Sequence, residues 1–450
     1  MTTLLANNAD VLVTMDGERR EIASGGLFAR DGVIEAVGAT ADLPAEADEI
    51  LDLSGAVLVP GLINTHHHFY QNLTRAVPAA QDATLFGWLT TLYPIWARMG
   101  PEEIFVSAQL ALAELALSGC TCSSDHLYMF PNGARLDDEI EAAATIGVRL
   151  HATRGAMSIG ESAGGLPPDS LVEREAQILE DCLRVIQGHH DPEPGAMVRI
   201  GVAPCSPFSV SRELMRDAAL LARDQGVHLH THLAENDDDI AYSLEHFGCR
   251  PGQYAEDLGW TGDDVWHAHC VKLDEGEIGL FARSGTGVAH CPCSNMRLGS
   301  GIAPVRAMLG AGVKVALGVD GSASNDAGDL LSEARQAMLL QRVRYGGDAL
   351  GARDTLEIAT RGGAAVLGRP DLGSLEVGKR ADFAVFDTGS VAMAGAWDAV
   401  AGLVFSGPHR ARHTVVEGRF VVRDGELATA DLGHVLETHA RLTRKLIDGG

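Results

Sequence analysis

Long hydrophobic runs and basic residues are scarce in this chain of 450 residues. No apolar stretch approaches the ~20 residues of a membrane span, and the N-terminus has no basic region before an apolar run. We therefore expect no membrane association and take a cytoplasmic location as the default. Lysine and arginine total 35 against 61 aspartate and glutamate residues, and the net charge of -26 repels phosphate backbones. This charge argues against a nucleic-acid partner but allows a neutral or cationic small molecule.

Cysteine is also sparse, with eight residues spread over the chain. Two Cys-x-Cys pairs lie inside apolar runs, unlike the disulfide framework of a small secreted protein. We expect buried free thiols. Because 46% of the residues are hydrophobic, the chain can bury a large core without such staples.

Short β-branched runs alternate with helix-length segments through the middle of the chain. The helical segments include residues 103–117, 170–186 and 211–224. Alternating strands and helices predict a parallel sheet, and eight such units match a closed (β/α)8 barrel of the TIM type. In such a barrel the reactive groups gather at the carboxyl ends of the strands. The eight predicted strands are residues 57–65, 119–126, 147–156, 198–205, 226–233, 265–270, 287–291 and 313–320.

The two ends of the chain differ from this middle part. The first residues alternate in hydrophobicity around turn signals, of which Asp31-Gly32 is typical of a hairpin. Segments 381–386 and 414–422 repeat this pattern near the other end. We therefore expect a small β-sandwich domain, built from both termini, beside the barrel. The expected parts are 1–56 and 369–450 for this domain, the latter with a terminal helix, and 57–368 for the barrel.

Histidines at the ends of predicted strands indicate a metal site. His66 and His68 are one residue apart, and side chains alternate along a strand, so both imidazoles can leave one face and share an ion. His232 is the uppermost of three alternating histidines, and same-face positions climb the barrel by ~6.6 Å. Because only the uppermost reaches the mouth, the lower His228 and His230 are expected to be support residues.

The same reasoning brings His269, rather than His267, to the mouth. The eighth predicted strand delivers Asp320, which by itself could equally be a helix cap or a turn residue. Three neutral nitrogens and one carboxylate suit Zn²⁺, our first choice, or Fe²⁺, with a position left for water. The expected ligands are His66, His68, His232 and Asp320.

Glu235 follows His232 by three residues, where strand passes into loop. A divalent ion lowers the pKa of its water towards ~7 and so supplies hydroxide at neutral pH. We expect Glu235 to pass a proton from that water to a ring nitrogen of the substrate, although it could also be a solvated loop residue. His269 would orient the hydroxide, and Asp320 would relay a proton to the departing amine.

With these motifs in place, the chain resembles the amidohydrolase superfamily, and within it the cytosine, guanine and S-adenosylhomocysteine deaminase branch. The resemblance covers nearly the whole chain. It rests on segments 60–68, 232–235, 268–270, 290–295, 318–321 and 373–382. Relatives with two ions use a carboxylated lysine on strand four, and the absence of lysine from residues 202–207 therefore implies a single ion.

Segments 66–76, 85–89 and 124–128 look most like the 8-oxoguanine deaminases of this branch. Guanine deaminases have a glutamine three residues after the second metal histidine, which is the place of Gln71, and an amide can donate to and accept from a purine edge. Cys205 replaces a histidine of S-adenosylhomocysteine deaminases and lies where guanine deaminase has an arginine-phenylalanine pair. Its small thiol could make room for an oxygen at the purine C8, or it could be an ordinary packed cysteine.

Two further residues complete the expected pocket. Trp88 could stack on a flat ring, and Arg154 could face a carbonyl or enolate oxygen of the substrate. The alternatives, a core anchor for Trp88 and an ion pair for Arg154, stay open at this point.

These motifs together predict metal-dependent deamination of a free purine base. The first choice is 8-oxoguanine, converted to urate and ammonia by metal-hydroxide attack on the amino-bearing ring carbon. An aminohydrolase or chlorohydrolase acting on isoxanthopterin, guanine or an s-triazine is the alternative, because it would use the same groups. A non-catalytic scaffold is the third hypothesis, which the complete hydrolytic set disfavours. The expected partner is a small heterocyclic base, and a homo-oligomer is compatible with the sequence.

Overall fold

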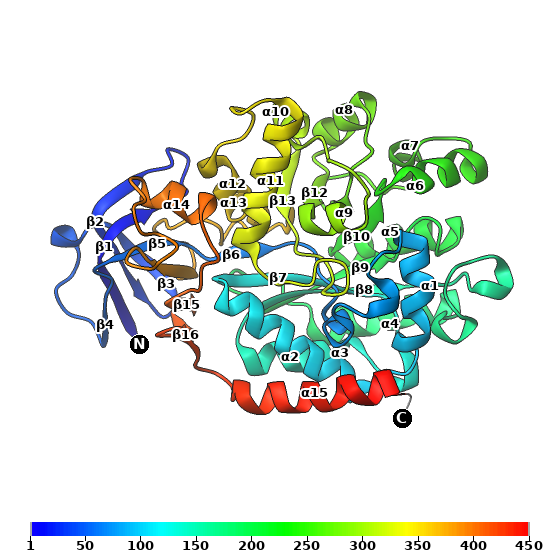
Figure 1. Ribbon diagram of the computed structural model, residues 1–450, viewed down its shortest axis with the longest axis horizontal. Coiled ribbons are helices and arrows are strands. Elements are labelled where there is room, and N and C mark those ends of the chain that lie inside the picture. The colour runs from blue at the N-terminus through cyan, green and yellow to red at the C-terminus, as the bar shows by residue number, and fades with distance from the viewer. Residues whose placement is uncertain (1, 449–450) are drawn as a thin grey trace.

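The computed structural model describes residues 2–448 and places them in a barrel and a separate sheet (Figure 1). The barrel sheet has eight strands, all parallel to their neighbours, in the order of the sequence. The backbone N–H of Thr65 donates to the Leu317 carbonyl at 3.0 Å, which joins the first strand to the last. This arrangement confirms the predicted (β/α)8 barrel. The strands are β6 (Leu62–Asn64), β7 (Cys120–Leu127), β8 (Arg149–Ala156), β9 (Val198–Pro204), β10 (His228–Leu233), β11 (Val265–His269), β12 (Gly287–His290) and β13 (Lys314–Leu317).

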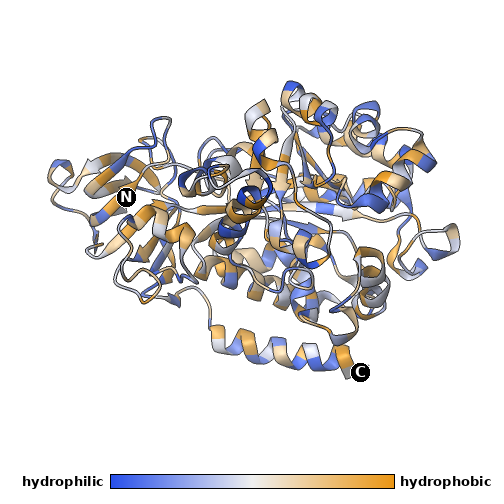
Figure 2. Ribbon diagram, turned by 45° about the horizontal axis from the view of Figure 1, so that its top comes forward, coloured by the Kyte–Doolittle hydropathy of each residue, from blue (hydrophilic) through white to orange (hydrophobic). Residues whose placement is uncertain are grey.

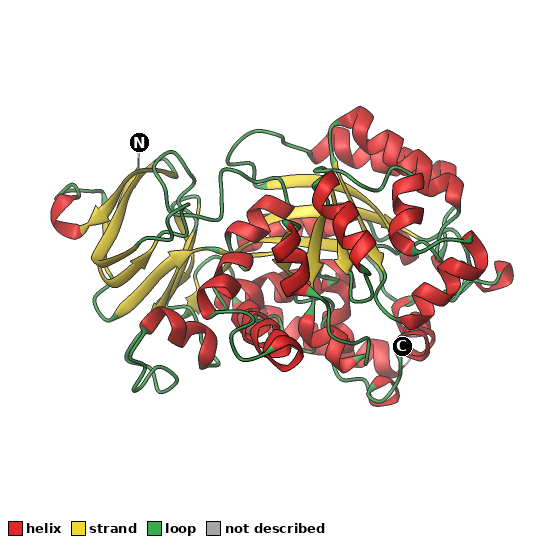
Figure 3. Cartoon of the chain, turned by 90° about the horizontal axis from the view of Figure 1, so that it is seen from above, coloured by secondary structure: helices red, strands yellow, loops and turns green. Residues whose placement is uncertain are grey.

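Helices surround these strands, as the view from above shows (Figure 3). The predicted helices 103–117 and 211–224 are found within two residues of their expected bounds, whereas the helix expected from residue 170 begins at Glu175. The helices are α1 (Leu85–Trp96), α2 (Pro101–Leu117), α3 (Leu136–Ile146), α4 (Glu175–His189), α5 (Arg212–Gln225), α6 (Asp237–Tyr242), α7 (Pro251–Asp257), α8 (Glu275–Ser284), α9 (Pro292–Arg297), α10 (Val305–Ala311), α11 (Leu330–Tyr345), α12 (Ala352–Ile358), α13 (Arg361–Val366), α14 (Ala399–Phe405) and α15 (Leu432–Asp448). Among the shorter turns of helix, η2 (Phe69–Thr74) follows His68 directly.

The prediction of one first strand over residues 57–65 is wrong, because this segment forms parts of two strands. β5 (Ala56–Pro60) pairs with strands of the other sheet, and β6 begins the barrel at Leu62. Between them, Gly61 passes so close to β7 that a Cβ would lie 2.1 Å from the Thr121 hydroxyl oxygen. Both strands are fully buried, so one continuous apolar run concealed the change of sheet.

Both ends of the chain build the other sheet, which confirms the expected small domain. Its strands follow the order β17-β16-β15-β14-β5-β1-β2-β3, and β4 pairs with β1. The hairpin expected at Asp31-Gly32 connects β2 to β3 in antiparallel register. The remaining bounds are β1 (Thr3–Val13), β2 (Glu21–Arg30), β3 (Val33–Ala39), β4 (Glu49–Asp52), β14 (Phe383–Asp387), β15 (His413–Val416), β16 (Arg419–Arg423) and β17 (Glu426–Leu427).

The last helix, α15, returns from this sheet to the barrel and packs along α2 (Figure 1). Hydrophobic and hydrophilic segments alternate along it (Figure 2), and Leu442 and Leu446 are buried. Lys445 Nζ donates to Glu103 Oε1 of α2 at 2.8 Å. Among residues 2–448, no helix is both long and apolar enough to cross a membrane. All eight cysteines are free thiols and six are buried, as expected from their scattered positions.

Candidate metal centre and active site

His66 and His68 lie just beyond the end of a barrel strand. β6 ends at Asn64, and the backbone of His66 and His68 is irregular rather than extended in a sheet. The His66 carbonyl accepts from the backbone N–H of Asp320 at 3.0 Å, so the segments that follow β6 and β13 are held side by side. Both imidazoles nevertheless converge on one site. His67 lies outside that ligand cluster and its ring packs against Phe69.

Hydrogen bonds at Nδ1 orient two of the histidines. His68 Nδ1 donates to the His126 carbonyl at 2.7 Å, and His232 Nδ1 donates to the Cys205 carbonyl at 2.5 Å. A carbonyl oxygen can only accept, so each Nδ1 carries the proton and each Nε2 keeps a lone pair. The lone pairs of both rings are therefore available to a cation.

His66 reaches the same state through another histidine. His230 Nδ1 lies 3.0 Å from the Trp266 carbonyl and must donate to it. His230 Nε2 is then the acceptor for His66 Nδ1, 2.8 Å away. His66 Nε2 is left buried with no hydrogen-bond partner. His230 thus lies below the site and fixes the orientation of the His66 ring.

The four expected ligands have the spacing of a metal site. His68 Nε2 and His232 Nε2 are 3.1 Å apart, and Asp320 Oδ1 lies 3.4 Å from His66 Nε2 and 3.3 Å from His68 Nε2. Two lone pairs that face each other at this distance repel unless a cation lies between them. Donor atoms around a tetrahedral ion with ~2.0–2.1 Å bonds are about 3.3 Å apart. The donor set, the spacing and the partnerless nitrogen all fit a divalent ion.

Burial keeps the histidine ligands neutral. It lowers the pKa of His232 to about 3, with further lowering from His68 and His269, and it lowers the pKa of His66 and His68 as well. For Asp320, burial alone would raise the pKa, but the neighbouring His66, His269 and His68 outweigh burial and hold the pKa well below its usual range. The site therefore offers neutral nitrogens and an ionised carboxylate, as metal ligation requires.

Glu235 and His269 lie beside the ligand cluster. His269 Nε2 is 3.6 Å from Glu235 Oε2 and 3.9 Å from Asp320 Oδ2, and its Nδ1 is held by Asn295 Oδ1 at 2.9 Å. Glu235 is only 4% exposed, so it is not a solvated loop residue. Burial raises the pKa of Glu235 to about 7 despite the opposing charge of His269. Burial opposes the charging of His269, but the two carboxylates outweigh it and raise the His269 pKa.

Several residues at the strand ends have left-handed backbone conformations that non-glycine residues rarely adopt. The φ angles are 51° at Ala234, 70° at His269 and 62° at Asp320. Such conformations cost of order 1–3 kcal/mol each and are kept where the surrounding structure enforces them, often at active sites. His269 and Asp320 both belong to a group that could hold a metal ion, and their left-handed backbone was not indicated by any sequence pattern.

A pocket opens directly above the ligands. Gln71, Trp88 and Cys205 line it together with Glu235. The Trp88 indole also donates to the Ala323 carbonyl at 3.0 Å, so this residue is both a core anchor and a pocket wall. Sequence reasoning missed eight further wall residues and His126, whose ring stacks on that of His232 with the ring centres 4.8 Å apart. These wall residues are Leu85, Leu89, Tyr93, Tyr128, Ser206, Phe208, Leu298 and Ser324.

Arg154 does not line this pocket. Its guanidinium bonds Glu173 at 2.7 and 2.9 Å and Asp181 at 3.0 Å, and it lies over the Phe130 ring. His151 of the same strand faces Trp266 inside the barrel, and Arg154 is three positions further, on the opposite face. The ion-pair interpretation is the one that its contacts support.

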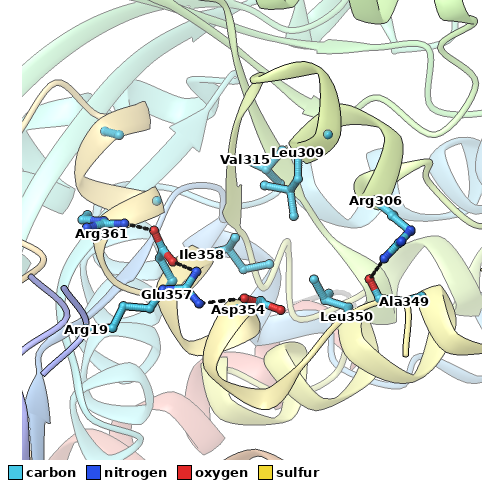
Figure 4. Close-up of a pocket in the computed structure, with 13 residues that line it drawn as sticks. Arg19, Arg306, Leu309, Val315, Ala349, Leu350, Asp354, Glu357, Ile358 and Arg361 are labelled. Carbon is cyan, nitrogen blue, oxygen red and sulfur yellow. Dashed lines mark hydrogen bonds and ion pairs between the residues drawn. The ribbon is translucent and has the colours of Figure 1, made fainter. Parts of the chain in front are cut away.

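A larger surface cleft of about 590 Å³ lies elsewhere, beside α10, α12 and α13 (Figure 4). Four of its charged residues are paired, in the contacts of Arg19 with Asp354 and of Arg361 with Glu357, and the fifth, Arg306, donates to the Ala349 carbonyl. None of the residues that line it is a histidine or a cysteine. The groups capable of metal-dependent chemistry are those at the barrel mouth.

Known proteins share this arrangement. The model of the amidohydrolase family matches residues 57–421. An 8-oxoguanine deaminase of Pseudomonas aeruginosa is 44% identical over 430 residues, which cover 95% of this chain and 96% of that protein. A hydroxydechloroatrazine ethylaminohydrolase of a Pseudomonas species is 36% identical over 472 residues, with 100% and 97% coverage.

A solved structure agrees with these matches. The zinc complex of an atrazine chlorohydrolase from Arthrobacter aurescens superposes with a TM-score of 0.93 at 36% identity, covering 98% of this chain and 100% of that one. The relatives are deaminases and hydrolases. In this chain, the group of His66, His68, His126 and His232 and the group of His66, His269 and Asp320 each have the spacing to hold a metal ion. The chain therefore belongs to the amidohydrolase family and is an aminohydrolase.

Proposed function

We propose that this protein is a zinc-dependent deaminase of a free purine base, converting 8-oxoguanine to urate and ammonia. The observation that carries this proposal is the placement of Gln71 in the pocket, 1% exposed and with its Oε1 atom unpartnered. A buried amide without a partner favours a ligand that supplies one, as a purine edge does. The 44% identity to an 8-oxoguanine deaminase supports the same substrate.

The protein groups around the pocket can perform the proton transfers. A bound divalent ion would lower the pKa of water towards ~7 and so provide the nucleophile at neutral pH. Glu235, whose pKa of about 7 lets it take and give a proton, would accept a proton from that water and deliver it to the ring nitrogen beside the attacked carbon. Asp320, which is ionised at the start, would take a proton from the hydroxyl group newly added to the ring carbon and pass it to the amine as the carbon–nitrogen bond breaks and the carbonyl forms. His269 would hold both carboxylates in place from 3.6 and 3.9 Å.

The pocket walls suit a flat, uncharged base. Trp88 and Tyr93 supply aromatic surface, and Cys205 forms part of the wall. Burial raises the pKa of the Cys205 thiol to about 12, so this wall is small and uncharged at neutral pH. It can therefore admit an oxygen at the purine C8 without placing a charge against it.

An s-triazine hydrolase is the second candidate. It is favoured by the fit to the atrazine chlorohydrolase structure and by the 36% identity to an ethylaminohydrolase. Displacement at an electron-poor triazine carbon would use the same nucleophile and the same Glu235. The higher identity to the 8-oxoguanine deaminase places it second.

Ammonia release from a panel of bases tests the proposal. The zinc-loaded and the iron-loaded protein would each be given 8-oxoguanine, guanine, isoxanthopterin, cytosine and a melamine-type triazine. We expect the highest kcat/KM with 8-oxoguanine and the zinc form. A clear preference for another base would overturn the substrate and leave the reaction class standing. No ammonia from any of them would overturn the deaminase proposal itself.

The site requires no partner beyond its small heterocyclic substrate. The net charge of -26 continues to argue against nucleic acid. We further propose that the protein is cytoplasmic and binds neither nucleic acid nor a membrane; a homo-oligomer is compatible with this function.

A further inference from the structure

Gly321, the residue after Asp320, lies directly against the side-chain amide of Gln71. A Cβ at position 321 would be 1.9 Å from Gln71 Oε1, 2.3 Å from Cδ and 2.8 Å from Nε2. A Cβ atom does not approach other heavy atoms this closely in a folded protein. The amide of Gln71 thus occupies the space that any side chain at position 321 would need.

The backbone at Gly321 does not require glycine. The left-handed φ of 62° belongs to Asp320, and Gly321 is not among the described glycines with positive φ. Its backbone N–H donates to Asp320 Oδ1 at 2.7 Å, and its carbonyl accepts from Ser324 N at 3.0 Å. Alanine could make both bonds. What alanine could not do is leave room for the amide.

Hydrogen bonds fix the backbone of Gln71, whereas the oxygen of its side-chain amide has no hydrogen-bond partner. Its N–H donates to the His68 carbonyl at 3.1 Å, and its carbonyl accepts from Thr74 Oγ1 at 3.0 Å. The amide lies at the far end of a flexible side chain, and its Oε1 has no hydrogen-bond partner. Added bulk at position 321 is therefore most cheaply relieved by rotating this amide away. That movement costs substrate recognition rather than folding.

We propose that Gly321 is a positioning residue for base recognition. Its missing side chain forms the slot that holds the Gln71 amide in the pocket, beside the carboxylate ligand. The same turn after β13 thus presents Asp320 to the metal and shapes the contact to the base. This inference rests on the proposed function in one respect, the binding of the base by Gln71.

A double-variant cycle tests the inference. Gly321→Ala, Gln71→Ala and the double variant would be compared by kcat and KM on whichever base the substrate panel identifies. We expect Gly321→Ala to lower kcat/KM about ten-fold, mainly through KM, as for the loss of hydrogen bonds to a ligand. The double variant should be no worse than Gln71→Ala, because the shorter side chain vacates the slot. Multiplicative losses would overturn the inference, since Gly321 would then act by another route.

Readouts independent of turnover separate this inference from the proposed function. A crystal structure of Gly321→Ala should show the Gln71 amide rotated out of its slot, with zinc content and melting temperature close to those of the wild type. An amide that stays in place, or a loss of zinc, would contradict the inference whatever the substrate proves to be. Gly38→Ala is the matched control, because a Cβ there would meet no atom within 4 Å.

Discussion

His66 Nδ1 donates to His230 Nε2 across 2.8 Å, so one imidazole determines which nitrogen of the other faces the ligand cluster. His68 and His232 use backbone carbonyls for the same purpose. A carbonyl can only accept, whereas an imidazole accepts only while its own proton is held elsewhere. The Trp266 carbonyl holds that proton, at 3.0 Å from His230 Nδ1. The orientation of His66, the first of the proposed metal ligands, thus depends on a side chain that a substitution can remove.

Replacement of His230 by leucine should weaken zinc binding about 10- to 100-fold, the usual effect of removing a group that orients a ligand. Zinc affinity measured by competition with a chelator checks this. His228→Leu is the matched control, because its ring lies lower on the same strand and bonds no ligand. Equal losses in the two variants would mean that barrel packing, rather than the orientation of His66, is responsible.

Replacement of Glu235 by glutamine should lower kcat by about 10²–10⁴-fold, the usual contribution of a positioned acid-base group. Zinc content and stability should stay unchanged, because Glu235 bonds no metal ligand directly and the amide has the same shape. Steady-state kinetics and metal analysis of the purified variant measure both. Asp237→Asn is a suitable control, since that side chain is 87% exposed. Near-normal turnover of Glu235→Gln would remove this residue from the mechanism.

The buried carboxyl pair Asp125 and Glu139 should make folding stability depend on pH. Burial raises the pKa of Asp125 to about 8, and burial together with the charge of Asp125 raises the pKa of Glu139 well above its usual range. Between about pH 4 and pH 8 the folded protein holds protons that the unfolded chain releases. The stability contributed by this pair is therefore complete at low pH and is lost as the pH rises through that window.

Glu139→Gln should flatten this dependence, because an amide can donate to Asp125 without titrating. The expected change in slope is about 1.36 kcal/mol per pH unit for each proton involved. Denaturant unfolding of the zinc-saturated protein between pH 5 and pH 8 measures it. Glu141→Gln, at an exposed position of the same helix, is the control. Parallel stability curves for wild type and Glu139→Gln would show that the pair shares no proton.

Arg154→Met should destabilise the protein by about 1–3 kcal/mol and leave KM unchanged. The loss comes from Glu173, which remains partly buried without its partner, and from Asp181, which keeps only its ion pair with Arg184. Thermal unfolding and steady-state kinetics distinguish the two effects. Arg174→Met removes an exposed arginine nearby and should change neither. A raised KM in Arg154→Met would instead indicate that Arg154 contributes to substrate binding.

The barrel, the termini-built domain and the ligand types could be predicted because they depend on local patterns. Alternating strand and helix signals recur along the chain, and the climb of ~6.6 Å between same-face positions of β10 distinguishes His232 from the lower His228 and His230. The division of residues 57–65 between two sheets could not be predicted. Both sheets bury those residues completely, so the hydrophobic pattern is the same on either side of Gly61.

Chemical identity and order along the chain were thus determined by the sequence: a set of metal-binding side chains at strand ends, with Glu235 behind His232 and Gln71 behind His68. Only the tertiary structure decided where those groups point. The tautomer of His66 depends on His230, 164 positions away, and the amide of Gln71 depends on the missing side chain of Gly321. Arg154 faces outward because strand alternation inside the closed barrel places it opposite His151. Such contacts join distant segments across the barrel, and no local pattern contains them.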